Sequence, residues 1–365
     1  MIPEGAQGLN SAKERSRAPV FVLGSPRSGT TLLYDMLLSS GGFAVYLAES
    51  NVFNLLAPRF GDLSSRTNRE RLLQAWLGSR LFRASGLQAE RVRQTILRDC
   101  RNPGDFLRIV MEEICALQGM QRWAENSPEG MLYLPTIKRL IPDALFVHII
   151  RDGRDVASSL GQLHYVRPFP WEDRYSLAGC GLYWEWIVQR GRNFGRTAGA
   201  DYMEVRFEDL LARPQETLEQ IGRFIDHPLD YETIQRIAYG SVSKPNTSFQ
   251  AESPDAGFNP VGRWKTRFSS KELLRFERLL GKTLQELGYT LGSEAIEKRA
   301  SLSLQATRWL HRTYFAGKYW YKNSGLVRAL RPIMKSVDID EVAVGDIHPA
   351  VVKRPSPESV GQSDR

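Results

Sequence analysis

Apolar runs alternate along the chain with segments of helical periodicity. Residues 18–24, APVFVLG, form a β-branched apolar run that ends at a glycine, which predicts a buried strand. Residues 145–150 and 202–206 predict two further strands, and a helical pattern follows each of the three runs. This alternation favours a parallel sheet covered by helices, so we predict an α/β fold with a single catalytic domain.

Other segments add detail to this plan. FAVYL at 43–47 predicts another strand, and residues 66–118 contain several helical patterns interrupted by turn residues. An aromatic-rich stretch at 173–196 predicts a long helix. Ser270 is expected to cap a strong helix that stops at Gly288.

Composition and charge divide the chain into four parts. We predict a flexible leader at 1–18, a catalytic domain at 19–292, a basic aromatic helical extension at 293–336 and a disordered tail at 337–365. The 365 residues carry a net charge of +8, and nine Lys and Arg with no Asp or Glu lie between Lys298 and Lys335. Removing those nine leaves 8 − 9 = −1, so the basic character belongs mostly to the extension.

Cysteine usage and hydropathy indicate the cellular compartment in which we expect the protein. The three cysteines have neither metal-ligand spacing nor a disulfide framework, so we expect reduced thiols. No run of 18 apolar residues predicts a membrane-spanning helix, and the first residues lack the apolar core of a signal peptide. We therefore expect a cytoplasmic protein, with the basic extension as a candidate peripheral membrane contact.

The stretch GSPRSGTT at 24–31 follows the first strand and opens the first helix. Gly24 and Gly29 are separated by four residues, as in the phosphate-binding loop G-x-x-x-x-G-K-[ST]. Small residues let backbone N–H groups turn inward around an anion, and the helix N-terminus adds unpaired donors. Thr30 stands at the lysine position, whereas the cation is Arg27.

A nucleoside triphosphatase needs that lysine to reach the β- and γ-phosphates. We therefore predict a ligand with one 5′-phosphate in the loop and one further group bonded to it near Arg27, whose planar guanidinium suits phosphate and sulfate oxygens. The alternative is a turn that merely joins strand to helix. Agreement of the glycines, the cation, the hydroxyls and the strand–helix context favours the anion site.

A second motif lies at 142–160, PDALFVHIIRDGRDVASSL. It places Arg151 directly after a strand and Ser159 in the first turns of the next helix. An arginine at the carboxyl end of a strand points into the crevice where open α/β sheets bind ligands, and charge-assisted hydrogen bonds there would hold a phosphate. The alternative is a surface cluster of Arg and Asp that caps the helix. The presence of the first motif, at 24–31, favours the phosphate site over this alternative.

Together the two motifs resemble the sulfotransferases that use 3′-phosphoadenosine-5′-phosphosulfate (PAPS). The loop is similar to their 5′-phosphosulfate loop, in the Arg-containing form of the protein-tyrosine and many bacterial members. The resemblance, which runs from about residue 19 to 290, implies a P-loop-like three-layer fold with a central parallel sheet flanked by helices. It also implies that the donor is bound by Arg27, Ser28, Gly29, Thr30, Thr31, Arg151 and Ser159.

Two weaker similarities extend the match. Residues 204–225 resemble the family's Tyr-Glu-Asp-Leu segment near the adenine, with Phe207 in place of the tyrosine. Residues 259–269 resemble the late Gly-x-Trp-Lys motif. The residues before it do not keep the family's Arg-Lys-Gly, so Arg263 is a candidate replacement on the 3′-phosphate; a solvated loop arginine is the alternative.

A sulfuryl transfer to a hydroxyl needs a base for the acceptor proton. Cytosolic family members use a histidine, but the matching stretch ENSPEG at 125–130 has none. Other members use a glutamate shortly after the first loop, which Glu49 matches, so we predict Glu49 as the general base, with Glu125 as the alternative. His148 is expected in the core, and His164 on the acceptor side is a weaker candidate.

One departure from the family bears on the rate of sulfuryl transfer. Related members often carry a lysine where this chain has Asn126, and an amide brings no charge to the transferring group. Arg27 is then expected to stabilise the leaving phosphate together with the loop amides.

Residues 308–322, RWLHRTYFAGKYWYK, interleave cations with aromatic side chains. One interpretation is a helix packed on the catalytic domain, with its Lys and Arg solvated; the other is a surface that meets anionic lipid or an anionic acceptor. Nucleic acid also fits the charge, but no recognition motif accompanies it.

These observations predict a PAPS-dependent sulfotransferase that transfers a sulfuryl group to a hydroxyl or amine and gives PAP and a sulfated product. No metal is expected. A P-loop kinase or NTPase, and a catalytically degenerate PAP-binding protein, are the alternatives. The acceptor is left open among a carbohydrate, a lipid-linked glycan, a protein tyrosine and a small alcohol or phenol.

Overall fold

The computed structural model describes residues 15–166, 176–237, 259–292, 302–324 and 339. The predicted tail, apart from residue 339, and most of the predicted leader lie outside these ranges. The end of the leader is anchored to the domain, since Arg15 donates hydrogen bonds to the carbonyl oxygens of Phe224 (2.6 Å) and Ala200 (2.7 Å).

A parallel sheet of four strands lies at the centre of the described structure, in the order β2-β1-β3-β4. The strands are β1 (Val20–Leu23), β2 (Ala124–Asn126), β3 (Leu145–Ile150) and β4 (Tyr202–Arg206). In register, Val20 pairs with Ala124 on one side and with Leu145 on the other. The three strands predicted at 18–24, 145–150 and 202–206 are confirmed, and the sequence did not predict the polar strand β2.

The strand predicted at 43–47 is wrong. The Ala44 N–H donates to the carbonyl oxygen of Arg122 (2.8 Å), but the next N–H, of Val45, donates to the side-chain oxygen of Gln118 (2.7 Å). A side chain therefore occupies the place where a neighbouring strand would have continued the ladder.

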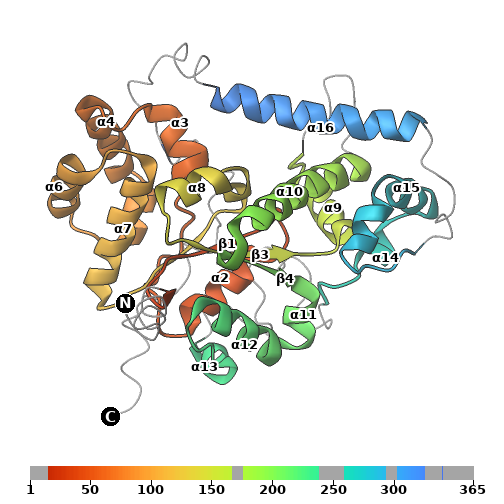
Figure 1. Ribbon diagram of the computed structural model, residues 1–365, viewed down its shortest axis with the longest axis horizontal. Helices are drawn as coiled ribbons and strands as arrows, with labels where there is room; N and C mark the ends of the chain where they lie inside the picture. Colours follow the sequence, from red (N-terminus) through yellow and green to blue (C-terminus); the bar gives the residue numbers. More distant parts are fainter. Residues whose placement is uncertain (1–14, 167–175, 238–258, 293–301, 325–338, 340–365) are drawn as a thin grey trace, which may run out of the picture.

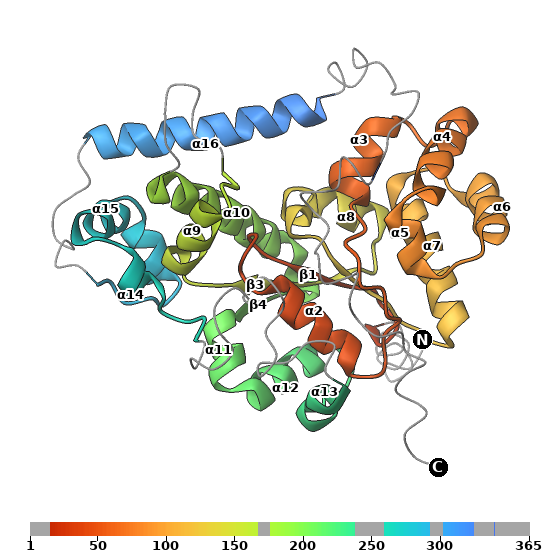
Figure 2. The same cartoon turned by 180° about the vertical axis from the view of Figure 1, so that it is seen from behind.

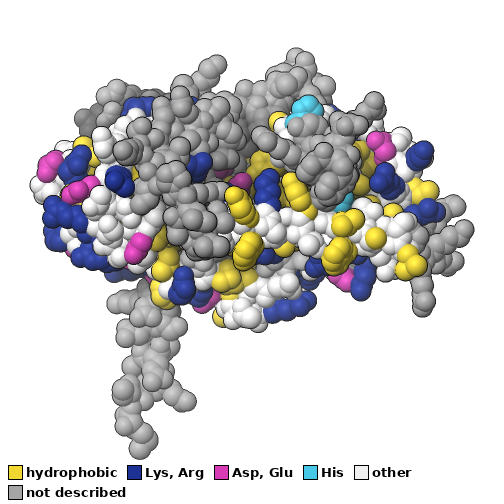
Figure 3. Space-filling view, turned by 90° about the horizontal axis from the view of Figure 1, so that it is seen from above, with side chains coloured by type: hydrophobic (Ala, Val, Ile, Leu, Met, Phe, Trp, Pro, Cys, Tyr) yellow, Lys and Arg dark blue, Asp and Glu magenta, His cyan; other side chains and the backbone are white. Residues whose placement is uncertain are grey.

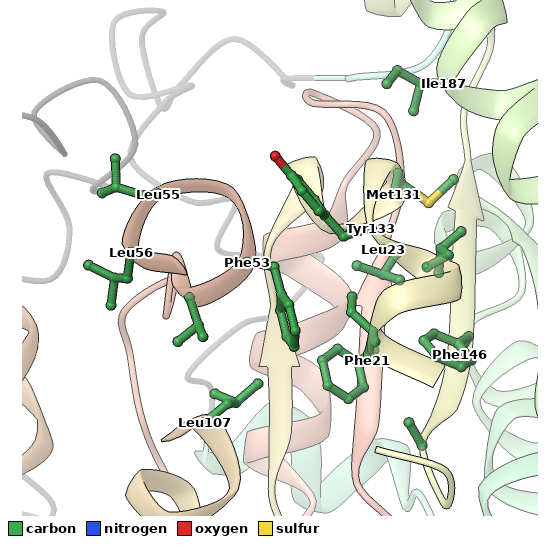
Figure 4. Packing of buried hydrophobic residues seen from close by; sticks show 14 of the residues in the cluster. Phe21, Leu23, Phe53, Leu55, Leu56, Leu107, Met131, Tyr133, Phe146 and Ile187 are labelled. Carbon is green, nitrogen blue, oxygen red and sulfur yellow. The ribbon is translucent and has the colours of Figure 1, made fainter. Parts of the chain in front are cut away.

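Alternate strand residues face two separate cores, which gives the three layers visible in Figures 1 and 2. Val20, Val22 and Val147 pack with the helices on one face. These helices are α2 (Thr30–Ser39), α11 (Phe207–Ala212), α12 (Pro214–Ile225) and α13 (Tyr231–Ile237). Phe21 and Phe146 point to the other face, where their ring centroids lie 5.7 Å apart (Figure 4).

The second face is covered by a larger set of helices. Three of them follow strands β2 and β3 and lie over the sheet: α8 (Leu134–Leu140), α9 (Gly153–Gln162) and α10 (Leu177–Ala198). A lobe to one side of the sheet contains a π-helical turn (Val52–Leu56), α3 (Ala57–Phe60), α4 (Arg66–Leu77), α5 (Arg80–Ser85), α6 (Ala89–Asp99) and α7 (Pro103–Gln118).

The remaining helices lie on the opposite side from this lobe and across the top of the molecule (Figure 1). They are α14 (Trp264–Arg267), α15 (Ser270–Glu286) and α16 (Leu302–Asn323). The cap of α15 is Ser269 rather than the expected Ser270: its hydroxyl accepts from the Glu272 N–H, and the Glu272 carboxylate accepts in return from the Ser269 N–H.

A buried ion cluster fastens α9 to α15. The Arg154 side chain is 3% exposed and donates to the Asp152 carboxylate (2.7 Å) and to the Glu277 carboxylate (2.7 Å), while its guanidinium lies 3.9 Å from the centroid of Trp264. Glu277 also accepts from the Gly292 N–H (2.8 Å). Because desolvated charges are costly unless paired, this cluster fixes the position of the residues that follow β3.

Removing Glu277 should therefore destabilise the fold. We expect Glu277→Ala to lower the free energy of unfolding by about 3–5 kcal/mol in urea denaturation, because it leaves Arg154 buried with one carboxylate fewer. Glu286→Ala on the same helix, which breaks the exposed pair with Lys282, should change it by less than about 0.5 kcal/mol. Equal effects of the two variants would contradict this account.

Candidate active site

The candidate site lies at the carboxyl edge of the sheet, where β1 stands between β2 and β3. The chain leaves β1 towards one side and β3 towards the other, which opens a crevice at this edge in parallel α/β sheets. Two glycines let the loop after β1 lie close to its neighbours. A Cβ on Gly24 would meet the Ile149 carbonyl oxygen at 2.5 Å, and a Cβ on Gly29 would meet the Phe207 ring at 2.4 Å.

Within this loop Arg27 has a strained backbone and a side chain that reaches across the crevice. Its φ of 73° lies in the left-handed region, which is uncommon for a residue with a Cβ. Its Nε donates a hydrogen bond of 2.9 Å to the hydroxyl of Ser159 on α9. The two motifs predicted to hold the two ends of the donor are therefore in direct contact.

Arg151, directly after β3, connects three segments. Its guanidinium donates to the Arg27 carbonyl oxygen (3.0 Å) and to the Pro260 carbonyl oxygen, and it lies 4.7 Å from the centroid of the Phe207 ring. Phe207 is itself 3% exposed. Its ring thus lies beneath Arg151 and against Gly29, and the place near an adenine that the family resemblance implies for Phe207 stays a prediction.

The late loop is brought to the site by Asp155. The two oxygens of this carboxylate accept from the Gly262 N–H (2.8 Å) and the Trp264 N–H (2.8 Å). Arg263, between these two residues, is close enough to act on both other site arginines. The sequence places Asp155 in an Arg-Asp cluster, but it gives no sign that a loop a hundred residues later binds there.

Positive charge accumulates in the crevice. Burial, followed by the nearby charges of Arg151 and Arg263, lowers the pKa of Arg27 to about 10. Burial also lowers the pKa of Arg151; Arg263 acts in the same direction, while Asp155 and Glu208 oppose it. Three guanidinium groups in one partly desolvated place favour a bound anion.

Three buried polar atoms around this edge have no hydrogen-bond partner within the part of the chain that the structure describes. They are the hydroxyl of Ser28, Nε of Arg151 and the side-chain oxygen of Asn126. Unpaired buried polar atoms are costly, and they are commonly completed by water or a ligand. Two of them are donors beside the loop glycines, which fits a phosphate-bearing ligand at this place.

The remaining predicted donor residues lie on the same loop and helix. Thr30 is the first residue of α2 and is buried, and Thr31 beside it is half-buried. Their position at the helix N-terminus is the one where backbone donors and the helix dipole favour an anion.

The candidate bases lie on the β2 side of the crevice. Glu49 is half-buried, and the next residue, Ser50, donates a 2.6 Å hydrogen bond to Glu125. Ser127 donates to the same Glu125 oxygen (2.6 Å). Burial raises the pKa of Glu125, and the two hydroxyls oppose that shift.

The two histidines differ in position. His148 is fully buried in β3, as predicted, with Nδ1 2.5 Å from the hydroxyl of Tyr202, and burial lowers its pKa to about 3. His164 is exposed after α9, with a φ of 51°. From the sequence, we expect acceptor-binding residues in the helical region 50–120 and in loops 162–175 and 241–260, and these two loops lie largely outside the described residues.

This geometry agrees with comparisons to known proteins. A family model described as "Sulfotransferase family" matches residues 19–231, more than half of the chain. The chain belongs to the sulfotransferase family. The match favours sulfuryl transfer over the kinase or NTPase alternative.

Two nematode relatives of this sulfotransferase-family chain are named as candidate protein-tyrosine sulfotransferases. The Caenorhabditis briggsae protein is 25% identical over 286 residues, which cover 75% of this chain and 90% of the relative. The Caenorhabditis elegans protein is 26% identical over 161 residues, which cover 43% of this chain. The second match spans 61% of that relative, less than two thirds of its length.

Solved structures support the fold. The sulfotransferase domain from the curacin biosynthetic pathway aligns with a TM-score of 0.51 and 17% identity, covering 74% of this chain and 98% of that domain. The P-loop-like three-layer fold expected from the motifs is thus confirmed.

The close contact of Gly29 with Phe207 can be tested against a second glycine. Gly41 has a similar φ, +84° against +93°, but a Cβ there would meet nothing within 4 Å. Gly41→Ala should lower the free energy of unfolding by about 1–2 kcal/mol, because a residue with a Cβ disfavours the left-handed backbone conformation. Gly29→Ala should cost at least about 1 kcal/mol more in urea denaturation, because its methyl group overlaps the ring.

A partial return of stability on adding Phe207→Leu to Gly29→Ala would identify the ring as the cause. Equal losses for the two single variants would show that the contact with Phe207 is not limiting.

Proposed function

We propose that this sulfotransferase uses PAPS as donor and transfers its sulfuryl group to a hydroxyl. The observation that carries the proposal is the hydrogen bond from Arg27 to Ser159, joined by the bond from Arg151 to the Arg27 carbonyl oxygen. These contacts bring the two anion-binding motifs to one crevice. A nucleotide with phosphate on both the 5′ and 3′ sides of its ribose needs two neighbouring anion sites in one crevice.

Each end of the donor has candidate ligands. The loop N–H groups, with Ser28, Thr30 and Thr31, would hold the 5′-phosphate at the N-terminus of α2. Ser159, Arg151 and Arg263 would hold the 3′-phosphate. Support comes from the Ser28 hydroxyl and Arg151 Nε, which have no hydrogen-bond partner among the described residues, and from the burial and neighbouring arginines that lower the pKa of Arg27.

The proposed reaction is an in-line displacement at sulfur. The acceptor oxygen forms a new S–O bond while the S–O bond to the 5′-phosphate breaks, and the leaving phosphate oxygen keeps the electron pair. Glu49 takes the acceptor proton. Arg27 and the loop N–H groups stabilise the charge that develops on the leaving phosphate, which is the type of interaction that lowers the barrier most.

Asn126 would contribute a neutral contact where related members carry a charge. A tyrosine phenol is the acceptor that the names of the relatives support. Carbohydrate, lipid-linked glycan and small alcohol acceptors remain to be compared in a panel with a tyrosine peptide.

Donor binding can be tested without knowing the acceptor. PAP should raise the thermal unfolding midpoint, whereas ATP and GTP should leave it unchanged. At a hundredfold excess of PAP over its dissociation constant, the free energy of unfolding should rise by about 2.7 kcal/mol. Arg151→Lys should abolish the PAP shift, since an ammonium cannot replace the forked contacts. Arg223→Lys, in an exposed pair with Glu219, should retain it.

Stabilisation by ATP in place of PAP would contradict the donor assignment. PAP binding without transfer of label from radioactive PAPS to any member of the acceptor panel would instead indicate a PAP-binding protein that has lost turnover.

The identity of the base can be separated from that of its neighbour. Glu49→Gln should lower kcat by about 10²–10⁴-fold and retain the thermal shift with PAP. Glu125→Gln should lower kcat much less. A base must be deprotonated, so the rate should rise as pH rises through its pKa. We expect this acid limb to be lost in Glu49→Gln and kept in Glu125→Gln.

The opposite result would make Glu125 the base. Because burial raises the pKa of Glu125, the acid limb would in that case lie above the range of an ordinary carboxyl group.

A further inference from the structure

Helix α16 is held on the domain by one of its faces. Arg308 pairs with the buried Glu185 of α10, and its Nε donates to that carboxylate at 3.0 Å. Phe315 is buried against the Tyr183 ring, with centroids 5.4 Å apart. The Tyr319 hydroxyl donates to the Leu132 carbonyl oxygen (2.6 Å). These contacts along the helix fix which side of it faces outward.

The outward side carries large apolar side chains near both ends and in the middle of the helix. Leu302, Trp309 and Trp320 are separated by seven and eleven residues, spacings that return an α-helix to about the same side. They are 84%, 65% and 65% exposed, and Leu310 (46%) and Tyr321 (56%) lie beside them. Seen from above, hydrophobic side chains form a broken row on the face where α16 lies, with Lys and Arg next to it (Figure 3).

Charge is arranged around this row rather than in it. Helix α16 contains no Asp or Glu, so nothing on the helix itself neutralises its cations. Arg308 and Lys322 turn towards carboxylates of the domain, Lys322 at 3.7 Å from Glu129. Arg312 and Lys318 are exposed. At 100° per residue, Arg312 lies about 80° from the row of Leu302 and Trp320 on one side, and Lys318 lies about 160° from it on the other side, beyond Leu310 and Tyr321.

We propose that α16 binds the surface of an anionic lipid bilayer. Exposed Trp and Leu would enter the boundary between headgroups and acyl chains, where Trp and Tyr are preferred, and Arg312 and Lys318 would meet lipid phosphates. Among the described residues no helix has the length and apolarity needed to cross a bilayer, so α16 would lie along the surface. This property is independent of the donor chemistry proposed above.

A second copy of the chain is a poorer fit to the same face. A symmetric dimer would place α16 against α16, and each partner would bring unopposed cations to the contact. A bilayer with anionic headgroups supplies both the apolar depth and the opposite charge.

Flotation with lipid vesicles tests the proposal on the full chain. Vesicles rich in phosphatidylglycerol should carry the protein, and phosphatidylcholine alone should carry much less. Trp309→Ser with Trp320→Ser should weaken binding by at least about tenfold. Arg312→Ser with Lys318→Ser should weaken binding to anionic vesicles by about 30-fold, since each surface cation contributes about a factor of five, and should remove the lipid preference.

Leu117→Ser is the matched control, because Leu117 is 58% exposed at the end of α7, away from α16. It should bind vesicles as the unchanged protein does. The substituted side chains are all exposed, so the thermal midpoints of these variants should agree and exclude misfolding as the reason for lost binding.

Fluorescence quenching measures how deeply the Trp side chains enter the bilayer. Brominated lipids should quench the Trp fluorescence of the unchanged protein, and Trp309→Phe with Trp320→Phe should still bind vesicles while losing most of that quenching. Failure of the unchanged protein to float with anionic vesicles would overturn the proposal. So would equal flotation of the Trp→Ser variant, or a dimer in sedimentation that this variant converts to a monomer.

Discussion

The guanidinium of Arg151 is the constraint on which the site depends. It ties the loop after β1 to the late loop through the carbonyl oxygens of Arg27 and Pro260, and it stacks on the ring of Phe207. A planar cation with several fixed donors can make these contacts at once, which an ammonium cannot. The positions of the loops that surround the crevice therefore depend on this side chain at the end of β3, together with the bonds that Asp155 makes to the late loop.

This arrangement has an electrostatic cost that a ligand would relieve. Burial and the nearby charges of Arg151 and Arg263 lower the pKa of Arg27, and burial and Arg263 lower the pKa of Arg151. Asp155 offsets part of the charge while its oxygens hold the late loop. A dianionic phosphate entering this crevice would complete the unpaired donors and compensate the repulsion, so binding and ordering of the loops would be coupled.

The sequence predicts much of this fold, and the exceptions have physical causes. Strands β1 and β3 follow from apolar runs, and β4 follows from the segment YMEVR. The strand β2 has the sequence AEN and carries no such run, because Glu125 is accommodated by two serine hydroxyls rather than by apolar packing. Both phosphate motifs were recognisable as local patterns. The contacts that Arg151 and Asp155 make with the late loop join residues about a hundred positions apart, and no local pattern records them.

The connection between β1 and β2 contains the whole helical lobe, although these two strands are neighbours in the sheet. Phe53, Leu72 and Leu107 from that lobe belong to the same core as Phe21. Figure 4 shows Phe53 and Leu107 on the side of Phe21. Only the residues of this connection up to α2 form the loop after β1. Beyond α2, the lobe joins the sheet by apolar packing and by the hydrogen bond from Ser50, beside Glu49, to Glu125 of β2. A change in the packing of the lobe can therefore move Glu49 while the loop that carries Arg27 keeps its own contacts with Arg151 and Ser159.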